Sequence, residues 1–166
     1  QGGTVNRENI QSGVYDVKEG WLIKQKELYK IRAPGITCMN ALSGGVAGTI
    51  DHPINNSKGC GTIMRMAPVG LMITDHEKAF KVGCELAAIT HGHPSGYLSA
   101  GFLASIVADL VNGLSLSTAI VNASVILKKW NEHQETLAAV EQALSLFETT
   151  KDMKEEVDSG IVEKLG

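Results

Sequence analysis

The segment from Gly96 to Asn112 is the feature of the sequence that most constrains the fold. It is apolar on nearly every side at helical spacing, so a helix formed by it must be buried on most of its surface. Small residues recur along it and let neighbouring helices approach closely. We therefore expect a central helix that Gly113 ends. The small residues are Ser99, Ala100, Gly101, Ala104, Ser105 and Ala108.

Apolar residues at helical spacing predict further helices before and after the central one. The segments expected to be helical before it are 14–31, 37–42, 62–73 and 79–89. Those expected after it are 120–130, 137–147 and 153–165, the last of which is more charged and peripheral. Short turns join these segments and no internal repeat is visible. The sequence therefore predicts an all-α fold, a compact orthogonal multi-helix domain spanning residues 1–166.

Helix boundaries can be proposed from residues that favour particular backbone conformations. Residues 74–77 have the spacing of a capping box. Gly92 is expected to end the preceding helix in a left-handed conformation. Pro68 should kink the 62–73 helix or mark an early turn in it. The Gly-rich stretch 44–53 reads as a loop.

Composition argues against several classes of protein. The net charge is −3 with no dense cluster of Lys and Arg, which disfavours binding to nucleic acid. No apolar run approaches the roughly 20 residues of a membrane span, and the polar first residues do not resemble a signal peptide. The three cysteines are widely spaced, which favours reduced thiols and a cytoplasmic location. Because the chain begins with Gln1, we expect an incomplete translation product.

The stretch 55–65 is the first candidate for a binding site. Its glycines let the backbone approach a ligand, free N–H groups at a helix start favour anions, and amide and hydroxyl groups can read sugar hydroxyls. The alternative is a turn with a helix cap. A buried Arg65 would need an acidic side chain or a bound anion as its partner. The candidate residues are Asn55, Asn56, Ser57, Gly59, Cys60, Gly61, Met64 and Arg65.

The second candidate joins two predicted helices and includes His91 and Tyr97. The spacing of His91 and His93 is not a usual helical metal-ligand spacing. A histidine that donates a hydrogen bond to a phosphate or sugar is one interpretation, and a histidine satisfied at a helix end is the other. Together the two segments predict one small-molecule site built from two junctions between a loop and a helix.

The sequence lacks the common patterns of catalytic residues. It has no paired-carboxylate motif, no Walker A motif and no G-x-G-x-x-G motif. Cys60 at a helix start could be reactive, but no base partner is evident. We therefore assign no catalytic residue and no metal ligand.

Taken together, these segments resemble the ADP-ribosylglycohydrolase family, which includes the dinitrogenase reductase-activating glycohydrolases. The resemblance rests on residues 56–61 (NSKGCG), 64–68 (MRMAP) and 90–97 (THGHPSGY), with 32–38 (RAPGITC) and Trp21 upstream. It implies an all-α fold and hydrolysis of the glycosidic bond between ADP-ribose and a protein side chain or a related molecule. It also implies two divalent cations, Mg²⁺ or Mn²⁺.

The resemblance also suggests roles for individual residues. The segment 56–65 is expected to line the ADP-ribose pocket, with Ser57 close to the distal ribose. His91 is expected to contact the diphosphate or ribose region. Many relatives have Asn at the position of Cys60, which puts a hydrogen bond from that position in doubt.

This chain departs from the family in the acidic motifs that hold the metals. Relatives carry a Thr-Asp-Asp-Thr motif near the N-terminus and an Asp-x-Asp motif near the C-terminus, and neither occurs here. We therefore expect part of an ADP-ribose pocket, no cation bound by this chain alone and no activity in isolation. Helix faces made to pack on missing helices should cause self-association. The alternatives are a non-catalytic ADP-ribose or nucleotide-binding module and an inactive structural fragment.

Overall fold

The computed structural model describes residues 21, 24–30 and 33–150. These residues form helices and turns, and they contain no strand, which confirms the predicted all-α class. The α-helices are α2 (Ile36–Ser43), α3 (Ala67–Met72), α4 (His76–Ala88), α5 (Pro94–Val111), α6 (Leu116–Leu127) and α7 (Gln134–Thr150). Two short 3-10 helices are η2 (Lys26–Tyr29) and η3 (Ile63–Arg65).

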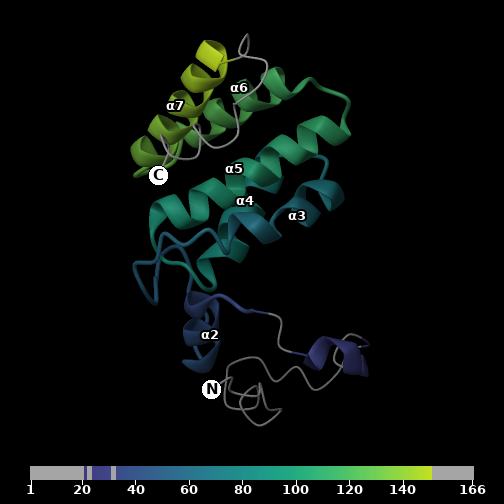
Figure 1. The fold of residues 1–166 in the computed structure, drawn as a ribbon, viewed down its shortest axis with the longest axis vertical. Coiled ribbons are helices and arrows are strands. Elements are labelled where there is room, and N and C mark those ends of the chain that lie inside the picture. Colours follow the sequence, from purple (N-terminus) through teal and green to yellow (C-terminus); the bar gives the residue numbers. More distant parts are fainter. Residues whose placement is uncertain (1–20, 22–23, 31–32, 151–166) are drawn as a thin grey trace.

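The helix α5 is the centre of this arrangement, as its composition predicts. It packs against η3, α3, α4, α6 and α7, and Figure 1 shows it running between α4 and α6. By length and composition α5 could cross a membrane, but 61% of it is buried inside the structure. Burial of this extent is typical of the core helix of a soluble protein. The helix α2 lies apart from the other α-helices, beyond the loops that lead to α3 and α5 (Figure 1).

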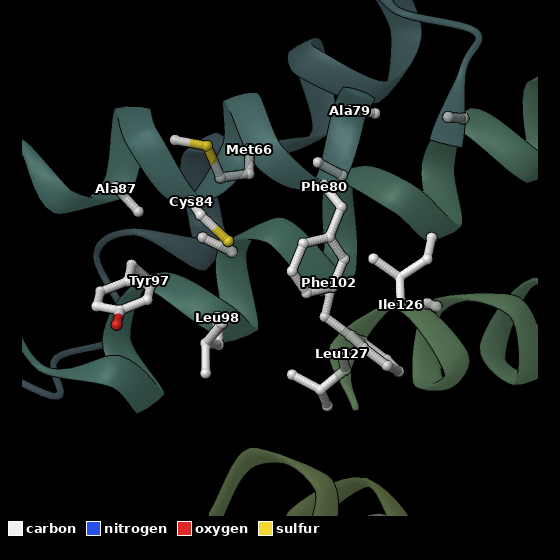
Figure 2. Close-up of a cluster of buried hydrophobic side chains, with 14 of the residues drawn as sticks. Met66, Ala79, Phe80, Cys84, Ala87, Tyr97, Leu98, Phe102, Ile126 and Leu127 are labelled. Carbon is white, nitrogen blue, oxygen red and sulfur yellow. The ribbon is translucent and has the colours of Figure 1, made fainter. Parts of the chain in front are cut away.

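Small residues allow α4 and α5 to pack in close contact. A Cβ atom on Gly101 of α5 would lie 2.6 Å from the carbonyl oxygen of Phe80 in α4, so the glycine is required by close approach. Phe80 itself is fully buried, and its ring centroid lies 5.6 Å from that of Trp130. Figure 2 shows Phe80, Phe102 and Leu127 gathered where α4, α5 and α6 meet.

Several helix boundaries differ from the sequence prediction. The residue that caps α4 is Asp75, whose side chain accepts from the backbone N–H of Lys78 at 2.9 Å, so the capping box is wrong by one residue. The left-handed conformation predicted at Gly92 is also wrong, since α4 ends at Ala88 with Ile89 in a right-handed conformation. Gly113 does take a left-handed conformation, with φ at +84°, and ends α5 as predicted.

The remaining predicted helices are confirmed in part. Residues 62–73 form two short pieces, η3 and α3, with Pro68 in the first turn of α3. Trp130 lies beyond the end of α6 and packs on the core from a turn. The described part of the segment 14–31 contains no α-helix and includes the 3-10 helix η2, where Leu28 is 64% exposed and so lacks the packing that stabilises an amphipathic helix. The predicted helix 153–165 lies outside the described residues.

A buried carboxylate joins three helices at the opposite end of α5 from the predicted site. Asp109 is 2% exposed, and its two oxygens contact His76 Nδ1 of α4 at 2.7 Å and accept from Asn122 Nδ2 of α6 at 2.8 Å. A buried charge is tolerated only when it is paired and hydrogen-bonded in this way. This network joins the start of α4, the last turns of α5 and the middle of α6.

We predict that Asp109→Ala destabilises the fold by about 3 kcal/mol, because it removes the buried carboxylate that His76 and Asn122 share and leaves a cavity among three helices. The free energy of unfolding from urea titration measures the effect. Glu85→Ala is the control, since Glu85 is exposed and pairs with Lys81 across 3.8 Å. It should cost less than about 1 kcal/mol. Equal losses for the two variants would contradict a structural role for the buried network.

Candidate functional site

The two segments predicted to form the site lie directly against each other. Asn55 is the residue that joins them: its Nδ2 donates to the carbonyl oxygen of Thr90 at 2.9 Å, and its Oδ1 accepts from the N–H of Gly92 at 3.1 Å. The same Oδ1 accepts from the N–H of Ser57 at 3.0 Å, which turns the first loop back on itself. One amide side chain therefore fixes both the shape of the first loop and its position on the second.

Gly92 makes this close approach possible. A Cβ atom on Gly92 would lie 2.6 Å from Cβ of Pro53 and would also overlap the carbonyl oxygen of Asn55. The physical reason for a glycine here is therefore space between two loops, and not the backbone conformation that the sequence suggested.

A second contact ties the first loop to the start of α5. Thr62 is fully buried and its hydroxyl donates to the carbonyl oxygen of Gly96 at 2.7 Å. The carbonyl oxygen of Ser57 lies only 2.8 Å from the position of a Cβ on Gly96, so the loop sits directly on the first turn of α5. The site therefore depends on the placement of α5 in the core.

Arg65 has partners of a different kind from those expected. Its Nη2 donates to the Thr90 hydroxyl at 2.9 Å and to the carbonyl oxygen of Leu86 at 3.2 Å, and its Nη1 contacts Sγ of Cys38 at 3.5 Å. The side chain is half-buried, and these partners are neutral acceptors and a thiol, where the sequence suggested an acid or an anion. Arg65 therefore links η3, α4 and α2 and supports the loops from within.

His91 lies beneath the first loop and is 1% exposed. Its Nδ1 is 2.8 Å from the hydroxyl of Thr90, and its Nε2 lies 3.1 Å from the position that a Cβ on Gly59 would occupy. Burial first, and the nearby Arg65 charge second, lower the pKa of His91 below its ordinary value, so the neutral imidazole is favoured. His91 thus forms the floor under Gly59 and Gly61.

His93 has a structural role at the start of α5. Its Nδ1 accepts from the N–H of Ser95 at 3.0 Å, and its carbonyl oxygen accepts from the N–H groups of Gly96 at 2.9 Å and Tyr97 at 3.2 Å. Pro94 has no N–H group. The histidine is satisfied at a helix end, as one interpretation proposed, but at an N-terminus and as a hydrogen-bond acceptor.

The helix α2 is tied to the first loop through a pair of hydroxyl groups. Oγ1 of Thr37 lies 3.1 Å from Oγ of Ser57, and Oγ of Ser57 also accepts from the N–H of Gly59 at 3.2 Å. The Ser57 hydroxyl is half-buried and held by two neighbours. Its position is therefore set by α2 as well as by its own loop.

The predicted site residues fall into two groups by exposure. Five of them face solvent or lie at the surface: Asn56, Gly59, Cys60, Met64 and, to a lesser extent, Gly61. Met64 is 74% exposed, whereas Tyr97 is 8% exposed and belongs to the core. The buried or half-buried members hold the loops, and the exposed members are those that a ligand can reach without a rearrangement.

An ion pair also connects the first loop to α7. Lys58 Nζ lies 2.7 Å and 2.8 Å from the two carboxylate oxygens of Glu135. The hydrogen bond from Lys58 lowers the pKa of Glu135 below its usual value. Both side chains are more than half exposed, so the pair orients the loop and adds little stability.

A comparison with models of protein families shows to which family this chain belongs. A family model described as ADP-ribosylglycohydrolase matches residues 6–165. The chain belongs to the ADP-ribosylglycohydrolase family. Comparisons with curated proteins and with solved structures gave no match. The resemblance inferred from the two loop segments is therefore confirmed at the level of the family, and the all-helical fold agrees with it.

Divalent cations are generally required in the ADP-ribosylglycohydrolase family, which makes the metal ligands a separate question. Among residues 21, 24–30 and 33–150, no three His, Cys, Asp or Glu side chains gather into a group that could hold a metal ion. Near the loops, Glu135 is paired with Lys58, and His93 caps α5. The described residues alone do not fit a two-cation centre, which needs several carboxylate oxygens.

Three threonines of this ADP-ribosylglycohydrolase chain organise the site and were not among the predicted residues. Thr90 connects Asn55, Arg65 and His91, while Thr62 and Thr37 fix the loop to α5 and α2. Thr62 lies in the candidate stretch 55–65, and Thr37 and Thr90 lie in segments 32–38 and 90–97, so their position was the only signal for them. Nothing in the sequence pairs Thr37 with Ser57, because that contact depends on how α2 docks.

We predict that Asn55→Ala destabilises the protein by about 2–3 kcal/mol, because each of three lost hydrogen bonds contributes about 1 kcal/mol and their partners lie between the loops. Asn56→Ala, at the neighbouring exposed amide, should change stability by less than about 0.5 kcal/mol. Urea unfolding of the two variants measures both values. Similar values for the pair would contradict the role assigned to Asn55.

The lowered pKa of His91 predicts a loss of stability in acid. Below about pH 6.5 the unfolded chain binds a proton at His91 that the folded protein resists, so this contribution is intact above that pH and shrinks as the pH falls. His91→Gln should therefore lose more stability relative to wild type at pH 7.5 than at pH 5. Unfolding titrations at both values test this, and an equal difference at the two pH values would contradict it.

Proposed function

We propose that this chain is part of a hydrolase that cleaves the glycosidic bond of ADP-ribosylated protein side chains or related ADP-ribosyl compounds, and that it carries part of the ADP-ribose pocket. The observation that supports this most is the direct contact between the 55–62 and 90–97 loops through Asn55, in a chain of the ADP-ribosylglycohydrolase family. Segments 35 residues apart are held at fixed geometry, as a preformed ligand site requires.

The exposed turn at residues 56–61 is the part of this surface that we expect to contact the ligand. Gly59 and Gly61 leave the backbone open to a ligand, and the Asn56 amide can exchange hydrogen bonds with sugar hydroxyls or phosphate oxygens. Cys60 and Met64 offer an apolar, polarisable edge at the same surface. In this proposal the Ser57 hydroxyl, which Thr37 and the N–H of Gly59 hold in place, contacts the ligand from the inner side of the turn.

His91 has a supporting role in this proposal. It is 1% exposed beneath Gly59, so direct contact with a ligand would require the turn to lift. The neutral imidazole is held by its hydrogen bond with Thr90. We expect it to fix the position of the turn 56–61 relative to α5. Its removal should therefore weaken binding by loosening the turn.

Binding and catalysis are expected to separate in this chain. Divalent cations, when bound in members of the family, supply Lewis-acid assistance to glycosidic cleavage. The contacts proposed for residues 56–61 involve amide, hydroxyl and backbone groups, which need no cation to bind ADP-ribose. We therefore expect ADP-ribose to bind with or without Mg²⁺, and we expect no hydrolysis by this chain alone.

Calorimetric titration with ADP-ribose, with and without Mg²⁺, tests this proposal. We predict metal-independent binding that Asn56→Ala weakens about tenfold, a loss near 1.4 kcal/mol that corresponds to one charge-assisted hydrogen bond. Asn131→Ala is the matched control, because Asn131 is an exposed amide in the turn after α6 and should bind as wild type does.

The other outcomes separate the alternatives. Ser57→Ala and His91→Ala should weaken binding if the Ser57 hydroxyl contacts the ligand and the His91 imidazole supports the turn 56–61. Circular dichroism shows whether these variants remain folded. Metal-independent binding without hydrolysis in any longer form of the protein would favour a binding module. Absence of ADP-ribose binding in both conditions would contradict the proposal for this chain.

A further inference from the structure

The three cysteines of the chain differ in their surroundings. Cys84 lies in the core and is fully buried, and burial raises the pKa of its thiol. Cys38 is half-buried on α2, and Cys60 is exposed in the turn of the candidate site. Two thiols of different elements are thus available at the junction between α2 and the site, and the third is an internal reference.

The sulfur of Cys38 lies against the turn that contains Cys60. Its Sγ is 3.5 Å from the position of a Cβ on Gly61, the residue that follows Cys60. The guanidinium of Arg65 contacts the same sulfur at 3.5 Å and holds it on this side of α2. The Thr37–Ser57 contact at 3.1 Å fixes the start of α2 to the same loop.

We propose that Cys38 and Cys60 form a redox-sensitive pair that closes to a disulfide and links α2 to the turn of the candidate site. A peroxide is the class of oxidant that we assign to it. It oxidises the exposed Cys60 thiol to a sulfenic acid and is itself reduced to water. The Cys38 thiol then attacks that sulfur, a second water leaves, and the S–S bond forms. The net change consumes two thiols and one hydrogen peroxide and yields one disulfide and two waters.

Exposure makes this closure feasible. A disulfide needs Cα atoms about 4.4–6.8 Å apart. Cys60 and its neighbour Gly59 are exposed, so closure moves the exposed side of the turn toward α2 over the buried His91 ring. Cys38 needs little movement, because its sulfur already faces the turn. Cys84 is separated from this process by its burial between α4 and α5.

The effect on ligand binding rests on the proposed function, whereas the cross-link does not. A bond at Cys60 would restrain the turn 56–61 and place a disulfide at the surface that we expect ADP-ribose to contact. Oxidation should therefore lower the affinity for ADP-ribose, and a thiol reductant should restore it.

Peptide mapping of the oxidised protein is the experiment that tests the pair. The protein is treated with hydrogen peroxide at low concentration, its free thiols are alkylated, and it is digested with trypsin without reduction. Cleavage after Lys58 separates Cys38, in peptide 33–58, from Cys60, in peptide 59–65. We expect these two peptides to be joined in monomeric protein, and peptide 82–128 to carry Cys84 without a cross-link.

Several results would overturn the proposal. Disulfides that join two copies of peptide 59–65 would show an intermolecular reaction instead, as would a dimer on a non-reducing gel. Cys38 that remains fully alkylated after Cys60 has been oxidised would exclude the pair. Cys60→Ser should abolish the cross-link and leave Cys38 free. Because mapping of the wild-type protein needs neither a variant nor a ligand, failure of ADP-ribose binding would leave this test intact.

Discussion

The burial of α5 is the constraint on which the rest of the structure depends. A helix that is apolar on nearly every side must be covered, and its small residues let α3 and α4 cover it at short range. The same helix begins at the candidate site, where Gly96 receives the loop 55–62 and His93 caps the first turn. The packing of α5 in the core therefore fixes the position and orientation of the candidate site at its first turn.

The candidate site separates residues that hold the loops from residues that are exposed. Asn55, Thr62, Thr90 and Arg65 form a continuous set of hydrogen bonds between two loops and three helices. Their groups are satisfied within the protein, so they are not free to bind a ligand without a cost. The exposed turn above them is short and rich in glycine, which suits the close approach of a ligand to the backbone.

Apolar surface remains uncovered on the outer sides of several helices. Leu137 and Val140 of α7 pack on the core, but Leu144 on the same predicted face is 41% exposed. Met72 of α3 is 83% exposed and Val121 of α6 is 61% exposed. Exposed apolar side chains on three helices are the sites through which copies could associate, and self-association stays a prediction for this chain.

The sequence by itself determined the helical class, the central helix, the family and the two segments that meet at the site, because periodicity and local motifs are properties of neighbouring residues. It could not decide which atoms pair across the chain. The sequence predicts a helix cap at Gly92, but the glycine is required because its missing side chain leaves room for Asn55. The sequence also predicts an acid or an anion as the partner of Arg65, whose partners are Thr90, Leu86 and Cys38. The partners of Arg65 lie up to 27 residues away and Asn55 lies 37 residues before Gly92, and only the packing of the helices brings them together.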